Sequence, residues 1–108
     1  VVEELVVGSS LATTGTIDLD LAALTGTVQT ITLTGNPTFT TSNRAVGRHF
    51  ELRLAAGGAT RTLAWPAGWI AFGVALPTSL ASGAVLRVAI ECLGTADTNI
   101  DATSVVSA

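Results

Sequence analysis

Apolar and polar residues alternate in several separate runs of the chain. In "TIDLDL", Ile17, Leu19 and Leu21 fall on one face, and Asp18 and Asp20 fall on the other. The same period of two recurs in "VQTITLT", "RHFELRL" and "VLRVAIECL". This period is typical of half-buried strands, and the many threonines suit a pleated surface. The pattern therefore predicts an all-β fold.

Turn-forming segments separate these runs. "LTGNPT" and "AAGGAT" are rich in glycine, and we expect the second to be a hairpin turn because its double glycine permits positive φ angles. No segment has a convincing helical period, and at most Asp20 to Leu24 could form a short helical turn. We expect one shared core that contains Phe50, Leu52, Leu54, Leu63, Leu86, Val88 and Ile90.

The chain of 108 residues suits one domain. The expected fold is an antiparallel sandwich or open barrel of about seven strands, formed by residues 11–108. An N-terminal arm, residues 1–10, precedes this domain. The last part of the chain, residues 100–108, is an apolar tail.

Charged residues are scarce. They make up 12% of the chain, whereas an ordinary soluble domain has about 25%. A surface so poor in charge favours association, so we expect a homo-oligomer. No apolar run is long enough for a membrane-spanning helix. The net charge is −3 and the basic residues are scattered, which argues against nucleic-acid binding; they are Arg44, Arg48, Arg53, Arg61 and Arg87.

The sequence gives little support for catalysis. The lone His49 lies on a polar strand face beside Glu51 and Arg53, and no "GxSxG" motif is present. The lone Cys92 excludes an internal disulfide, and its apolar neighbours predict a buried, inert thiol. We expect no enzyme activity, no catalytic residue and no cofactor.

The segment "DTNID" resembles the opening of a calcium loop through Asp97, Asn99 and Asp101. Ala102 stands where such a loop needs glycine, and the chain ends before the twelfth loop position. A polar loop before a last strand is the simpler interpretation, and we expect no metal site. The aspartates of "TIDLDL" are interpreted as a solvated face.

Both tryptophans fall in "TLAWPAGWIAFGVALP". Leu63 and Trp65 share a strand face, Pro66 ends the strand, and "PAGW" is a turn that returns Trp69 towards Trp65. Two interpretations are open. The indole rings stack on a sugar, or they cap one end of the core, where a large ring with a single N–H suits a half-wet position.

The order of four segments resembles a β-module of tailed-bacteriophage virion proteins. They are "TLTGNPTFT", "GRHFELRL", "TLAWPAGWIAFGVALP" and "GAVLRVAIEC", and the likeness covers residues 26 to 93. The family often closes with an aromatic-rich strand, and "NIDATSVVSA" has no aromatic residue. In the look-alikes the tryptophan–proline segment recurs in fibres with different receptors, which favours a framework role.

The resemblance implies a structural protein of a phage virion. We expect a capsid decoration (cement) protein on the capsid exterior, a homotrimer whose partners are the major capsid protein and sister subunits. A tail-fibre or tail-tip receptor-binding module is the alternative. A carbohydrate-active enzyme is a third hypothesis, for which the sequence offers no defensible pair of carboxylates.

Both ends of the chain are apolar, although free termini are usually polar. Either they dock on a neighbouring subunit or a capsid shell, for example by strand addition, or they pair within their own domain. The expected assembly contacts are Val1, Val2, Leu5, Val6, Val7, Trp65 and Trp69.

Overall fold

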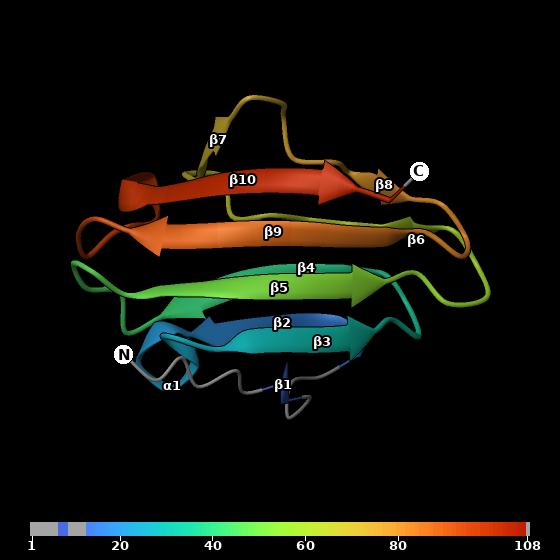
Figure 1. Cartoon of the computed structure of the whole chain (residues 1–108), viewed down its shortest axis with the longest axis horizontal. Coiled ribbons are helices and arrows are strands. Elements are labelled where there is room, and N and C mark those ends of the chain that lie inside the picture. Colours follow the sequence, from blue (N-terminus) through green and yellow to red (C-terminus); the bar gives the residue numbers. More distant parts are fainter. Residues whose placement is uncertain (1–6, 9–12, 108) are drawn as a thin grey trace.

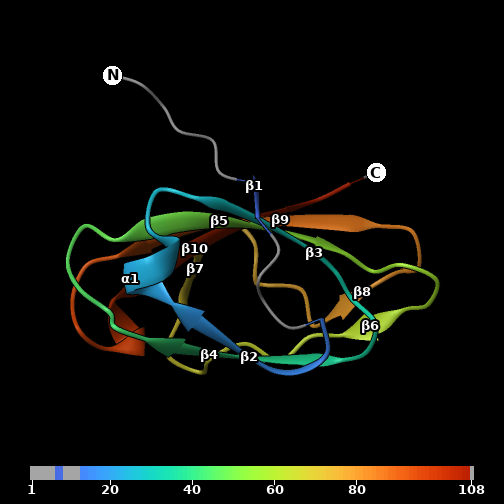
Figure 2. The ribbon, with the colours of Figure 1, turned by 90° about the horizontal axis from the view of Figure 1, so that it is seen from below.

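The protein is a two-layered β-sandwich (Figure 1, Figure 2). The computed structural model describes residues 7–8 and 13–107. The first layer is a six-stranded sheet in the order β1 (Val7–Gly8), β3 (Val28–Thr32), β5 (His49–Ala55), β9 (Val85–Cys92), β10 (Ile100–Val106) and β7 (Ile70–Phe72). The second layer contains β2 (Gly15–Asp20), β4 (Pro37–Ser42), β6 (Arg61–Thr62) and β8 (Ser79–Leu80). This confirms the predicted all-β sandwich.

The second layer consists of two strand pairs that are joined by backbone contacts. β2 pairs with β4, and β6 pairs with β8. A bridge between Thr38 and Ala64 connects β4 to the residues that follow β6, and the amide of Phe39 donates to the carbonyl of Ala64 at 2.9 Å. The two pairs therefore form one continuous layer opposite the large sheet, as Figure 2 shows.

The expectation of a purely antiparallel fold was wrong. Only β5–β9, β9–β10 and β6–β8 are antiparallel, whereas β1–β3, β3–β5, β2–β4 and β7–β10 are parallel. For β1–β3, β2–β4 and β3–β5 the reason is that the chain crosses between layers after β1, β2, β3 and β4. Strands two apart in the sequence then become neighbours in one layer and run in the same direction. Alternation shows which face of a strand is buried, but not which strand lies beside it.

The "AAGGAT" segment is not a hairpin turn. β5 lies between β3 and β9, so both of its edges are already paired. The chain must therefore leave the sheet after Ala55, and this segment carries it across to β6 in the second layer. Gly57 has a φ of +75° and lies against the Leu33 carbonyl, so a glycine is still required there.

The predicted core is confirmed. All seven expected residues are buried, and they pack with residues of the second layer that include Ile17, Leu19, Phe39 and Leu80. Full burial of one such side chain stabilises the fold by about 1.5–3 kcal/mol. The single helical turn is also confirmed as α1 (Leu21–Leu24), which buries two leucines at one end of the sandwich.

The C-terminal segment is not a free tail. Residues 100–106 form β10, which pairs with β9 on one side and β7 on the other. Of the expected arm, residues 1–6, 9 and 10 lie outside the described residues. Val7 and Gly8 form β1, where Val7 is the register partner of Val28. In the described part of the chain, no helix has the length and apolar character needed to span a membrane.

Candidate interaction surface

The two tryptophans form one aromatic cluster with Phe39. The ring of Trp65 stacks on Phe39 with centroids 4.6 Å apart and planes at 11°. The turn after Pro66 returns Trp69 to within 5.6 Å of Trp65, as the sequence predicted. This turn is closed by the amide of Trp69, which donates to the Pro66 carbonyl at 3.3 Å.

Both indole N–H groups are used inside the domain. Trp65 Nε1 donates to the Pro77 carbonyl at 2.8 Å, and Trp69 Nε1 donates to an Asp97 carboxylate oxygen at 3.3 Å. Trp69 is only 9% exposed, and Trp65 is half-buried against the core. The rings therefore hold the β6–β7 connection against the second layer. This arrangement caps the core and leaves little of either indole face for a sugar.

Asp97 opens the short 3-10 helix η1 (Asp97–Asn99) instead of a calcium loop. Besides Trp69, its carboxylate accepts a hydrogen bond from the Thr41 hydroxyl, so it ties η1 to β4. Asp101 lies on β10, where its register partner on β9 is Glu91. Among the residues that the structure describes, no group of three or more His, Cys, Asp or Glu could hold a metal ion.

The aspartates of β2 form a hydrogen-bonded polar face. Asp18 accepts from the Thr40 and Ser42 hydroxyls at 3.0 and 2.7 Å. Asp20 caps α1 through the Ala22 amide at 3.0 Å and accepts from the Asn43 amide at 2.8 Å. The hydrogen bond from Asn43 is the main cause that lowers the pKa of Asp20.

The two residues considered for catalysis lie on neighbouring strands but on opposite faces of the sheet. His49 is exposed, with its Nδ1 atom 3.1 Å from the Gly47 carbonyl. Cys92 is buried, as predicted, and its thiol donates to the Gly94 carbonyl at 3.0 Å. The two residues are therefore separated by the sheet, one on its outer face and the other in the core.

Exposed apolar side chains gather at one edge of the large sheet. Phe72 is 51% exposed on β7, and Val105 is 70% exposed on β10. β7 is an edge strand of the sheet (Figure 1). We call this region the apolar margin; it comprises Ile70, Phe72, Val74, Val105 and Val106.

The β7 side of the margin lies in a stretch of the chain without charged residues, whereas on the β10 side Ile70 is paired with Asp101 and Val105 with Arg87. No Asp, Glu, Lys, Arg or His occurs from Thr62 to Leu86, a stretch that includes β7 and β8. Depletion of charge and exposure of aromatic or aliphatic side chains are features of protein interfaces. The sequence interpretation singled out the tryptophans and the apolar C-terminal end with Val105 and Val106, and it missed Phe72. The uninterrupted uncharged stretch is the signal that could have located the margin.

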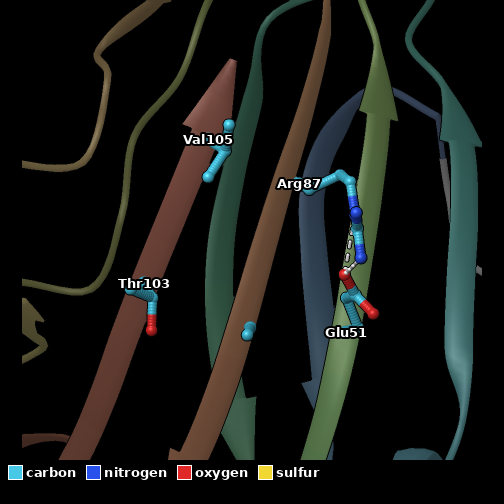
Figure 3. Close-up of a pocket in the computed structure, with 5 residues that line it drawn as sticks. Glu51, Arg87, Thr103 and Val105 are labelled. Atoms are coloured by element: carbon cyan, nitrogen blue, oxygen red, sulfur yellow. Dashed lines mark hydrogen bonds and ion pairs between the residues drawn. The ribbon is translucent and has the colours of Figure 1, made fainter. Parts of the chain in front are cut away.

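A shallow hollow lies beside the margin, on the outer face of the large sheet (Figure 3). It is lined by Glu51, Arg87, Ala89, Thr103 and Val105, which come from β5, β9 and β10. Arg87 forms an ion pair with Glu51 across the strands, with Nε 2.8 Å from the carboxylate. The hollow is therefore lined by three uncharged residues and one ion pair.

No family model, curated protein or solved structure matches this chain. The resemblance to the phage module accordingly stays a prediction from the sequence.

Proposed function

We propose that this chain is a non-enzymatic structural protein of a tailed-phage virion, most specifically a capsid decoration protein. In this role it forms a homotrimer and binds the major capsid protein on the capsid exterior. The proposal joins the resemblance of residues 26 to 93 to the surface of the molecule. The observation that carries it is the apolar margin, a group of exposed apolar side chains on a charge-poor domain.

The arrangement of the margin suits assembly. β7 is short and forms an edge of the sheet, so its outer backbone groups are available to another chain. Side chains of the margin stand on both β7 and β10, which are in register at Phe72 and Thr103. A partner that covers this edge would gain backbone hydrogen bonds and bury Phe72 in one contact.

The tryptophan segment has a supporting role in this proposal. The aromatic cluster fixes the turn that leads directly into β7, so it positions the margin without contacting a partner. The role differs from the assembly contact that we expected of Trp65 and Trp69, because both rings pack within the domain.

Co-sedimentation with capsid shells tests the proposal. Shells of the phage that encodes the chain, prepared without it, should bind the purified protein saturably at a fixed number per lattice position. Phe72→Ser should weaken this binding about tenfold or more, as expected for an aromatic anchor in an interface. The matched control is Val46→Ser, because Val46 is 75% exposed but lies outside the margin.

Two results would contradict the proposal. One is an absence of saturable binding to shells, and the other is equal binding by Phe72→Ser and the control. Saturable binding to bacterial cells in place of shells would instead support the tail-fibre or tail-tip alternative.

A further inference from the structure

Two arginines face each other on the outer surface of the large sheet. Arg53 on β5 and Arg87 on β9 are register partners, and both are exposed. Like charges directly opposite across two strands destabilise the pair unless an anion lies nearby. Glu51 supplies one carboxylate, and this carboxylate forms an ion pair with Arg87. The pair therefore offers room for a second acidic group.

Arg53 differs from the other arginines in its contacts. Arg44, Arg48 and Arg61 donate to backbone carbonyls, and Arg87 pairs with Glu51. Within residues 13 to 107, Arg53 has neither a hydrogen bond nor an ion pair through its guanidinium group. A guanidinium group can bind a carboxylate through two parallel hydrogen bonds, so Arg53 suits an acidic partner.

The hollow next to this pair suits an apolar partner. Val105 is the register partner of Arg87 on β10, and Ala89 and Thr103 are register partners on the same strands. These residues line the hollow, and β9 separates their β10 members from Arg53 on β5. The surface therefore suits a segment in which a carboxylate lies beside aliphatic side chains.

The chain itself contains such a segment. "VVEELVV" places Glu3 and Glu4 between Val1, Val2 and Leu5. We propose that this N-terminal segment of one copy docks on the outer sheet face of a second copy, with a glutamate at Arg53 and Leu5 in the hollow. The inference rests on the homo-oligomeric part of the proposed function and names a contact between neighbouring subunits.

The sheet order favours docking on a second copy over docking within one chain. β1 is separated from β9 by β3 and β5, which is about 14 Å at the usual strand spacing. Leu5 lies two residues before Val7, so it reaches only about 7 Å from β1. Within one chain Leu5 cannot enter the hollow, whereas the hollow of a neighbouring copy has no such constraint.

Disulfide trapping between two differently tagged full-length chains tests this inference. One chain carries Leu5→Cys and the other carries Thr103→Cys; Cys92 is buried and does not compete. Mild oxidation should yield a covalent heterodimer at least about five times faster than with Val46→Cys in place of Thr103→Cys, because docking raises the effective concentration. A heterodimer that forms no faster than in this control overturns the inference.

A charge reversal gives a second readout in the full chain. Arg53→Glu should weaken self-association about tenfold in sedimentation, because it places like charges together. Adding Glu3→Arg and Glu4→Arg to the same chain should restore association. If circular dichroism shows that the variants are folded and association is not restored, the inference is wrong. If Arg53→Glu does not fold, Arg53→Gln replaces it in the same experiment and should weaken association less.

Capsid co-sedimentation of the same variants separates the two proposals. If wild type and Arg53→Glu bind shells but no heterodimer is trapped, the docking inference fails and the proposed function stands. If trapping succeeds and no variant binds shells, the docking inference stands and the capsid role fails.

Discussion

Truncation of Trp65 should destabilise the domain strongly. Its indole stacks on Phe39, contacts Trp69, and donates to the Pro77 carbonyl. Complete removal of a fully buried aromatic side chain costs about 3–5 kcal/mol. Because Trp65 is half-buried, we expect Trp65→Ala to lower the free energy of unfolding by about 3 kcal/mol, the low end of that range.

A more conservative change separates the contributions. Trp65→Phe keeps a ring on Phe39 but removes the hydrogen bond to Pro77, whose net contribution is about 0.5–1.5 kcal/mol. We therefore expect a loss of about 1 kcal/mol for this variant. Urea unfolding followed by circular dichroism measures both values, and Val46→Ala is the exposed apolar control outside the margin, with an expected change within about 0.5 kcal/mol.

The order wild type, Trp65→Phe, Trp65→Ala tests the framework role of the cluster. The reasoning would be refuted if Trp65→Ala unfolded within about 0.5 kcal/mol of wild type. In that case the indole would contribute little to the fold, and a recognition role on the surface would become the better explanation.

Three further changes test other parts of the structure. Gly68→Ala should cost about 1–3 kcal/mol in urea unfolding, since the new Cβ would lie 2.9 Å from a backbone nitrogen of the η1 segment; Gly58→Ala, which meets nothing, is its control and should be nearly neutral. Leu86→Ala, at a site with 0% exposure, should cost about 2–5 kcal/mol, and a smaller loss than Gly58→Ala would contradict the core. Asp20→Ala should be less stable than wild type at pH 7. The hydrogen bond from Asn43 lowers the pKa of the Asp20 carboxyl in the folded protein. The stabilisation by the Asp20 carboxylate is therefore present above the usual pKa of 3.8 and is lost as the pH falls through the lowered pKa of the folded state. A stability difference between wild type and Asp20→Ala that stays the same at strongly acidic pH would contradict this.

Much of the core was predictable because burial follows the pleat of each strand. Phe50, Leu52 and Leu54 alternate with polar residues, and each is buried, as are Leu86 and Ile90 on the neighbouring strand. The turn at "PAGW" was predictable for a local reason, since proline cannot continue a strand ladder.

Strand order and direction were not predictable from the same pattern. β3 alternates in the same way whether its neighbour is β2, β4 or β5, and only the crossing of the chain between layers makes β5 its parallel partner. The error at "AAGGAT" has the same origin, because a glycine pair suits both a hairpin and a crossing between layers.

The surface was only partly predictable. Scarcity of charge in the whole chain indicated association, but it did not say where. Phe72 and Val105 come from distant segments, and the pairing of β7 with β10 brings them to one edge. The opposition of Arg53 and Arg87 likewise depends on the register of β5 against β9.

The mass of the protein in solution tests the central claim of an assembling structural protein most directly. Sedimentation equilibrium at micromolar concentration should give three times the 10.9 kDa mass of the single chain. Phe72→Ser should shift the distribution towards the single-chain mass, and Val46→Ser should not. A stable single-chain species for the wild type at this concentration would contradict the account.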